Sequence, residues 1–226
     1  MSRDELRTRS AALPPSLQRD GAACWPTDPD GGGTWIGTTG HGLTLGLLNV
    51  NLGVHEPPSS GTRTRGEIVP SLASCADAAA AASELLAKDL TRYRPFRLVA
   101  VDATAVVDLR WDRHRLIETS RRLAPACFVS SGLGDHVVEP RLMLFDSIFS
   151  ARSATSEMQD GFHQHVWPNH EHLSVMMNRE LARTTSVTTV ETRRTRSGET
   201  SVSMRHRDDD GVGEPVALSG LVAAAC

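Results

Sequence analysis

The strand-like runs of this sequence come in consecutive blocks, and they do not alternate one for one with helices. Runs of apolar and β-branched residues fill residues 34–49, 96–118 and 186–206, with helical patterns at 65–93 and 138–149 between them. A doubly wound parallel sheet needs a helix between successive strands, so this order favours an α+β fold with antiparallel sheets. We expect one domain over the whole chain.

The clearest local prediction is a β-hairpin within residues 34–49. A glycine turn, Gly40-His41-Gly42, separates two strand-like halves, and such a turn is typical of a tight hairpin. Residues 1–33 contain four prolines and the run Gly31-Gly32-Gly33. We therefore expect that N-terminal stretch to be mostly loop.

Periodicity and capping residues predict the remaining elements. A short helical segment should open at Arg65, and a longer helix should span residues 76–93, with Asp77 as its N-cap. Residues 208–226 should form an exposed, flexible tail. Further predictions are strands at 96–102, 105–111, 115–118 and 126–130, a helix at 138–149, an irregular stretch at 150–171, and strands at 173–177, 186–191 and 201–206 with a turn at 196–198.

Charge and hydropathy argue against several classes of partner. The formal net charge of −3 argues against nucleic acid. No apolar run approaches the roughly 20 residues that span a bilayer, and the first residues lack the apolar region of a signal peptide. The four cysteines form no Cys-x-x-Cys pair, so we expect reduced thiols, a cytoplasmic location and no cysteine zinc site.

Four short motifs follow one another along the first 135 residues. They are SRDE at residues 2–5, GGTWIG at 32–37, RGEIV at 65–69 and VSSGLGD at 129–135. This ordered set resembles the NRDE family, which is related to transport-and-Golgi-organisation proteins, although Ser2 replaces the first Asn of the name-giving tetrad. The resemblance implies an N-terminal-nucleophile-like αββα sandwich of four layers, with two antiparallel sheets stacked between helices.

The resemblance also implies amide hydrolysis by an N-terminal nucleophile. In related N-terminal-nucleophile hydrolases a cysteine attacks an amide and its own α-amino group serves as base, and NRDE proteins usually begin Met-Cys. Here the tetrad directly follows Met1, where the family would place about two strands of ordinary length. We therefore expect the first strand or strands to be missing and the chain as written to be inactive.

By this resemblance the catalytic candidates are Asp4, Arg3, Asn49 and Ser131. Asn49 ends a hairpin similar to that of cholylglycine and penicillin V hydrolases, which ends in an oxyanion-stabilising Asn, although a strand-end cap is the alternative. Asp4 would orient the nucleophile with Arg3 balancing its charge, unless the tetrad is a solvated surface run. Ser131 stands where many relatives have a second Asn and would donate one hydrogen bond. We expect Asp4 and Asn49 near the same end of the molecule.

Two further features remain open. Ser2 is a chemically possible nucleophile after removal of Met1, but activation needs a base within hydrogen-bonding reach. The second feature is a cluster of four histidines, His163, His165, His170 and His172. Such a cluster is compatible with zinc, nickel or haem iron, but its spacing matches no known ligand pattern, and a solvated loop is the simpler interpretation. We expect no metal and no cofactor.

Two functions follow from the resemblance. One is an amidohydrolase of linear carbon–nitrogen bonds, or a former one. The other is a non-catalytic binding or trafficking protein for an apolar small molecule, since animal members of the family are linked to Golgi organisation and to haem or lipid handling. The expected partner is therefore a small-molecule substrate or an apolar ligand.

Overall fold

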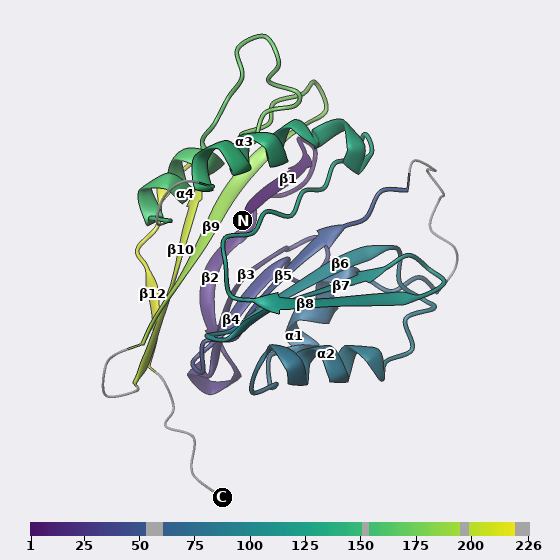
Figure 1. Ribbon diagram of the computed structural model, residues 1–226, viewed down its shortest axis with the longest axis vertical. Coiled ribbons are helices and arrows are strands. Elements are labelled where there is room, and N and C mark those ends of the chain that lie inside the picture. Colours follow the sequence, from purple (N-terminus) through teal and green to yellow (C-terminus); the bar gives the residue numbers. More distant parts are fainter. Residues whose placement is uncertain (53–60, 151–153, 195–198, 220–226) are drawn as a thin grey trace, which may run out of the picture.

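The computed structural model describes residues 1–52, 61–150, 154–194 and 199–219. Within these ranges the strands form two antiparallel sheets, one of five and one of seven strands, with helices on their outer faces (Figure 1). The α+β class and the two antiparallel sheets predicted from the sequence are confirmed.

The seven-stranded sheet is a meander in which each strand pairs with the next along the chain. Thr39 donates its backbone N–H to the carbonyl of Leu43 at 2.9 Å, and Gly42 has φ +90°, so the predicted glycine hairpin is confirmed. The strands, in order, are β2 (Leu13–Gln18), β3 (Ala23–Thr27), β4 (Ile36–Thr39), β5 (Thr44–Asn49), β6 (Phe96–Val101), β7 (Ala105–Trp111) and β8 (Leu116–Arg122).

The five-stranded sheet combines the two ends of the chain. Its strand order is β1-β9-β10-β11, and β12 also pairs with β10. Ser2 lies opposite Val187 in the β1–β9 pair, and the register shifts between Arg3 and Asp4. The strands are β1 (Ser2–Leu6), β9 (Ala182–Arg194), β10 (Thr200–Asp208), β11 (Gly211–Val212) and β12 (Val216–Ser219).

Two helices, α1 (Ile68–Leu72) and α2 (Ala78–Leu86), cover the outer face of the seven-stranded sheet. The predicted cap of α2 is confirmed, because the Asp77 carboxylate accepts from the backbone N–H of Ala80 at 2.7 Å. This helix ends before the predicted residue 93, although Tyr93 remains buried. The apolar side chains of both helices pack against those of β5, β6 and β7 to form the larger core.

Helices α3 (Pro140–Phe149) and α4 (Ser156–His163) lie against the other sheet (Figure 1). Between the two sheets a smaller apolar cluster joins Cys24 on β3 to Val202 and Met204 on β10 and Leu218 on β12. Strand alternation makes this arrangement possible, because residues two apart on β10 face the same layer.

Residues 1–33 were wrongly predicted as loop, since they contain β1, β2 and β3. The prolines are tolerated because β2, which carries Pro14 and Pro15, is an edge strand, and because the pairing of β3 with β4 stops at Cys24, before Pro26. Long-range pairing therefore overrides the local loop signals. Similarly, β12 lies in the predicted flexible tail, where Leu218 is only 3% exposed.

The predicted strands at 126–130 and 173–177 are also wrong. The first is an extended crossing segment without ladder partners, and the second is a series of turns whose Val175 and Met177 are nevertheless buried. The predicted irregular stretch at 150–171 contains α4, which begins where the Thr155 hydroxyl accepts from the Met158 N–H at 3.3 Å. Strands β8, β9 and β10 run longer than predicted. The predicted turn at 196–198 lies outside the described residues.

Two of the glycine-containing motifs meet backbone to backbone. Thr34 donates its N–H to the carbonyl of Gly66 at 3.0 Å, and a Cβ atom on Gly33 would lie 2.4 Å from the carbonyl carbon of Gly66. No side chain fits in that space. The contact holds the start of β4 against the turn that leads into α1.

We expect Gly33→Ala to lower the free energy of unfolding by about 1–3 kcal/mol, because overpacking against rigid backbone forces the two segments apart. Urea unfolding followed by circular dichroism measures the change. The matched control is Gly132→Ala, whose added Cβ would meet nothing within 4 Å. Equal stability of the two variants would contradict the assigned contact.

Candidate functional site

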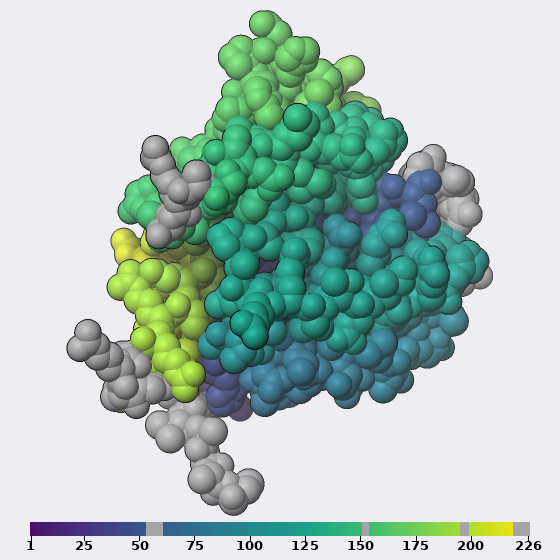
Figure 2. All heavy atoms as spheres, in the orientation of Figure 1, coloured from purple at the N-terminus to yellow at the C-terminus, as the bar shows by residue number. Residues whose placement is uncertain are grey.

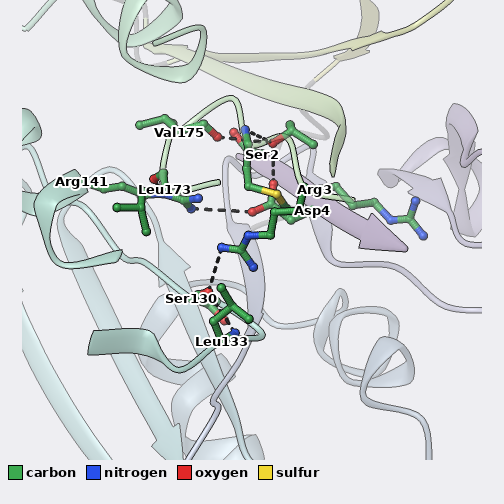
Figure 3. Close-up of polar contacts among 12 residues, drawn as sticks. Ser2, Arg3, Asp4, Ser130, Leu133, Arg141, Leu173 and Val175 are labelled. Carbon is green, nitrogen blue, oxygen red and sulfur yellow. Dashed lines mark hydrogen bonds and ion pairs between the residues drawn. The ribbon is translucent and has the colours of Figure 1, made fainter. Parts of the chain in front are cut away.

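Asp4 is a partly exposed carboxylate whose two oxygens both have partners (Figure 3). The Thr184 hydroxyl donates to Oδ1 at 2.6 Å, and Nη1 of Arg141 lies 3.7 Å from Oδ2. Burial raises the pKa of Asp4, while the Thr184 hydrogen bond and the charges of Arg141 and Arg179 oppose that rise. Strand β1, strand β9 and helix α3 therefore meet at one acid.

Arg3 does not supply the charge balance that the sequence predicted for Asp4. Its side chain points away from Asp4 (Figure 3), as alternation along a strand requires. Its guanidinium instead lies 3.2 Å from Glu5 and 3.6 Å from Asp28, and stacks 4.7 Å over the ring of Trp35. Arg141 and Arg179 take the predicted role of Arg3.

Ser131 and Asn49 reach the neighbourhood of Asp4 through residues 130–131. Nη2 of Arg179 donates to the Ser131 hydroxyl at 3.2 Å, and the Ser130 hydroxyl donates to the backbone carbonyl of Asn49 at 2.6 Å. Asn49 is exposed, and its backbone makes this connection. Asp4 and Asn49 thus lie on different sheets but are joined by one short segment, and their catalytic roles stay predictions.

An open polar groove borders this cluster. It is lined by Arg7, Glu171, Asn178, Arg179 and Glu180. The side chain of Arg7 donates to Asn178 Oδ1 at 2.5 Å and to the backbone carbonyl of Arg179 at 3.2 Å. Arg7 therefore connects residues 178 and 179 of the groove wall to β1. Cations, carboxylates and an amide are all present, which suits a polar end of a ligand.

The described thiols are poor nucleophiles. Burial raises the pKa of Cys24 to about 11 and that of Cys127 to about 11, and it also raises the pKa of Cys75. A cysteine attacks as its thiolate, so these shifts reduce reactivity at neutral pH. The three side chains are therefore better described as small packing residues.

Ser2 has an imidazole within reach, because its hydroxyl lies 2.9 Å from Nδ1 of His163 on α4. Burial lowers the pKa of His163 to about 3. An imidazole with so low a pKa stays neutral at pH 7, but it is a weak base. The pair therefore has the geometry for proton transfer but not a matched pKa.

The four clustered histidines separate in the structure. His163 contacts Ser2, His165 packs at 5.0 Å against Trp167, and the rings of His170 and His172 lie 6.1 Å apart. Among the described residues there is no group of three or more His, Cys, Asp or Glu side chains placed to hold a metal ion.

A family model described as Transport and Golgi organisation 2 matches residues 1–204. The chain belongs to the Transport and Golgi organisation 2 family. The match includes all four sequence motifs and extends through β9, so the recognised resemblance is confirmed. A search of curated proteins finds no match. None of the helices in the described ranges is long and apolar enough to cross a membrane.

Three residues at the centre of this site were not identified from the sequence. Thr184 and Arg179 follow the last helix, where no short motif stands out, and Arg141 is the one buried residue of α3. A buried arginine within a helix signals a buried carboxylate partner, but the sequence does not say which acid it meets.

We expect Arg141→Met to lower the free energy of unfolding at pH 7 by about 1–2 kcal/mol, because it leaves the partly exposed Asp4 carboxylate with one cation fewer. The pKa of Asp4 is already raised in the folded state, so protonation favours folding as the pH falls through it. The loss should therefore shrink with falling pH. Urea unfolding across a pH series measures both effects.

The control is the double variant Arg141→Met with Asp4→Asn, which removes both charges of the pair. It should recover part of the stability at pH 7 and show little of the extra pH dependence. A single variant with a loss that is independent of pH would contradict the assigned pairing.

Proposed function

We propose that this chain is a non-catalytic binding protein for an apolar small molecule, built on a scaffold related to N-terminal-nucleophile amidohydrolases. The observation that carries the proposal is that Asp4 and Ser131, which the family resemblance predicts to be catalytic, already make hydrogen bonds to other protein groups. Asp4 accepts a hydrogen bond from Thr184, and Ser131 accepts one from Arg179. The neighbouring Ser130 donates to the Asn49 carbonyl at the end of β5. Asp4 and Ser131 would thus serve to hold β1, β9, α3 and the segment at 130–131 together.

The state of Ser131 supports this proposal. Its hydroxyl oxygen accepts from the Leu133 N–H at 3.2 Å and from Arg179, and its own N–H donates to Asp135 at 3.0 Å. Ser131 is also only 5% exposed, whereas an oxyanion donor must face the place where charge develops on the substrate in the transition state. The described thiols have raised pKa values, which also disfavours attack on an amide.

The ligand that we propose is haem or a lipid, as the family resemblance implies. The open groove lined in part by Arg7 and Arg179 offers such a molecule a place to bind beside the candidate site. The proposal keeps the cytoplasmic location expected from the sequence. It agrees with three described cysteines that are free thiols, Cys24, Cys75 and Cys127.

Amide hydrolysis is the second candidate, and the contact between Ser2 and His163 favours it. A hydroxyl at 2.9 Å from an imidazole nitrogen is the geometry of an activated nucleophile. It ranks second because burial lowers the pKa of His163 to about 3, far from the operating pH of a general base.

We expect the purified chain not to hydrolyse a panel of N-acyl amides. We also expect haemin or oleate to quench the tryptophan fluorescence of the chain as either one binds. Saturable quenching by either ligand would support binding. Absence of quenching by both would contradict the proposed function.

The Ser2→Ala variant separates binding from catalysis. It removes the hydroxyl while leaving a small residue at that position. Turnover of an amide by the wild-type chain that disappears in Ser2→Ala would establish the hydrolase and identify Ser2 as its nucleophile.

A further inference from the structure

One face of β6, β7 and β8 carries a group of charged side chains beside the buried Val99 and Val106. Phe96, Leu98 and Ala100 of β6 enter the core beneath α1 and α2, as do Val107, Leu109 and Trp111 of β7. Since side chains alternate along a strand, the residues between them face the other way. That opposite face, which we call the arginine face, carries Arg97, Asp108, Arg110 and Arg121.

Register brings these charges together. Arg97 lies directly opposite Arg110, and like charges in that position repel. Asp108 compensates in part, with its Oδ1 3.1 Å from Nε of Arg97. Asp108 also experiences the charges of Arg121 and Arg110. Among these four residues three cations face one anion, which leaves two positive charges in excess at neutral pH.

An aromatic ring borders the arginine face. Phe128 lies in the segment that runs from β8 toward α3 (Figure 1), and its ring centroid is 5.5 Å from the guanidinium carbon of Arg97 and 4.9 Å from that of Arg121. The segment continues to Ser130 and Ser131, which contact Asn49 and Arg179. The arginine face therefore adjoins the candidate site.

This end of the sheet lies away from the main contact between the two sheets. Strands β10 and β12 pack chiefly over β2, β3 and β4. Arg110 is half-buried and Arg121 is exposed. Figure 2 shows that the residues of β8 and of the segment after it form part of the outer surface. A small molecule can thus reach guanidinium groups whose mutual repulsion it would relieve.

We propose that the arginine face binds the doubly negative end of a small molecule, a phosphate monoester or a dicarboxylate, with Phe128 against the adjoining apolar part. Two excess positive charges match two negative ones, and planar guanidinium groups bind carboxylate and phosphate oxygens through paired hydrogen bonds. The inference rests on the proposed function, because it names the charged end of the ligand that the binding protein takes.

The test is isothermal titration calorimetry of the full chain at neutral pH and low salt with three probes. Phenyl phosphate and succinate represent the two sources of a doubly negative group, and acetate is the singly charged control. We expect saturable binding of at least one of the first two, at least about tenfold tighter than acetate.

Variants locate the site. Arg110→Gln and Arg121→Gln should each weaken binding roughly tenfold, since each removes a paired charge-assisted contact. Asp108→Asn should tighten binding, because it removes the competing carboxylate. The matched control is Arg122→Gln on the same strand, where alternation directs the side chain to the other face. Its binding should stay within about twofold of wild type.

Two results would overturn the inference. One is no saturable binding of either phenyl phosphate or succinate to the wild-type chain. The other is an equal loss in Arg122→Gln and Arg121→Gln, which would show only non-specific attraction. Binding of haemin or oleate without binding of either probe would leave the proposed function standing and remove this inference alone.

Discussion

The ion pair between Asp4 and the buried Arg141 draws its partners from distant parts of the chain. Thr184 comes from β9, Arg141 from α3 and Arg179 from the turns that precede β9. Arg141 is only 6% exposed, and an unpaired buried charge would cost several kcal/mol, so α3 and β1 must come together for the fold to be stable. The position of the candidate site is therefore a consequence of how one acid is accommodated, and the segment at 130–131 is drawn in through Arg179.

Residues of the family-like motifs make packing and backbone contacts that do not depend on any catalytic role. The glycines of GGTWIG and RGEIV touch backbone to backbone, and the tetrad forms a strand that sends Arg3 toward Trp35 and Asp4 toward α3. Conformational and packing demands alone explain why these residue types occur there.

Sequence patterns predicted the elements that depend on local chemistry. The hairpin at Gly42 and the cap at Asp77 follow from backbone geometry and from a side chain next to a helix end, and both are confirmed. Patterns failed where distant strands decide the conformation. Proline-rich residues 13–27 became strands because they pair with partners, whereas residues 126–130 have strand-like composition but no ladder. The neighbours of Asp4 were missed because they lie far away in sequence.

The pairing of β1 with β9 has a consequence for the order in which this protein can form. The seven-stranded meander lies between those two strands in sequence and pairs only neighbours, so it can assemble while the chain is still being made. Strand β1 has no partner until β9 has also been synthesised. During that interval its edge is open to incorrect partners, and premature termination anywhere before β9 would leave the N-terminal strand without its place in a sheet.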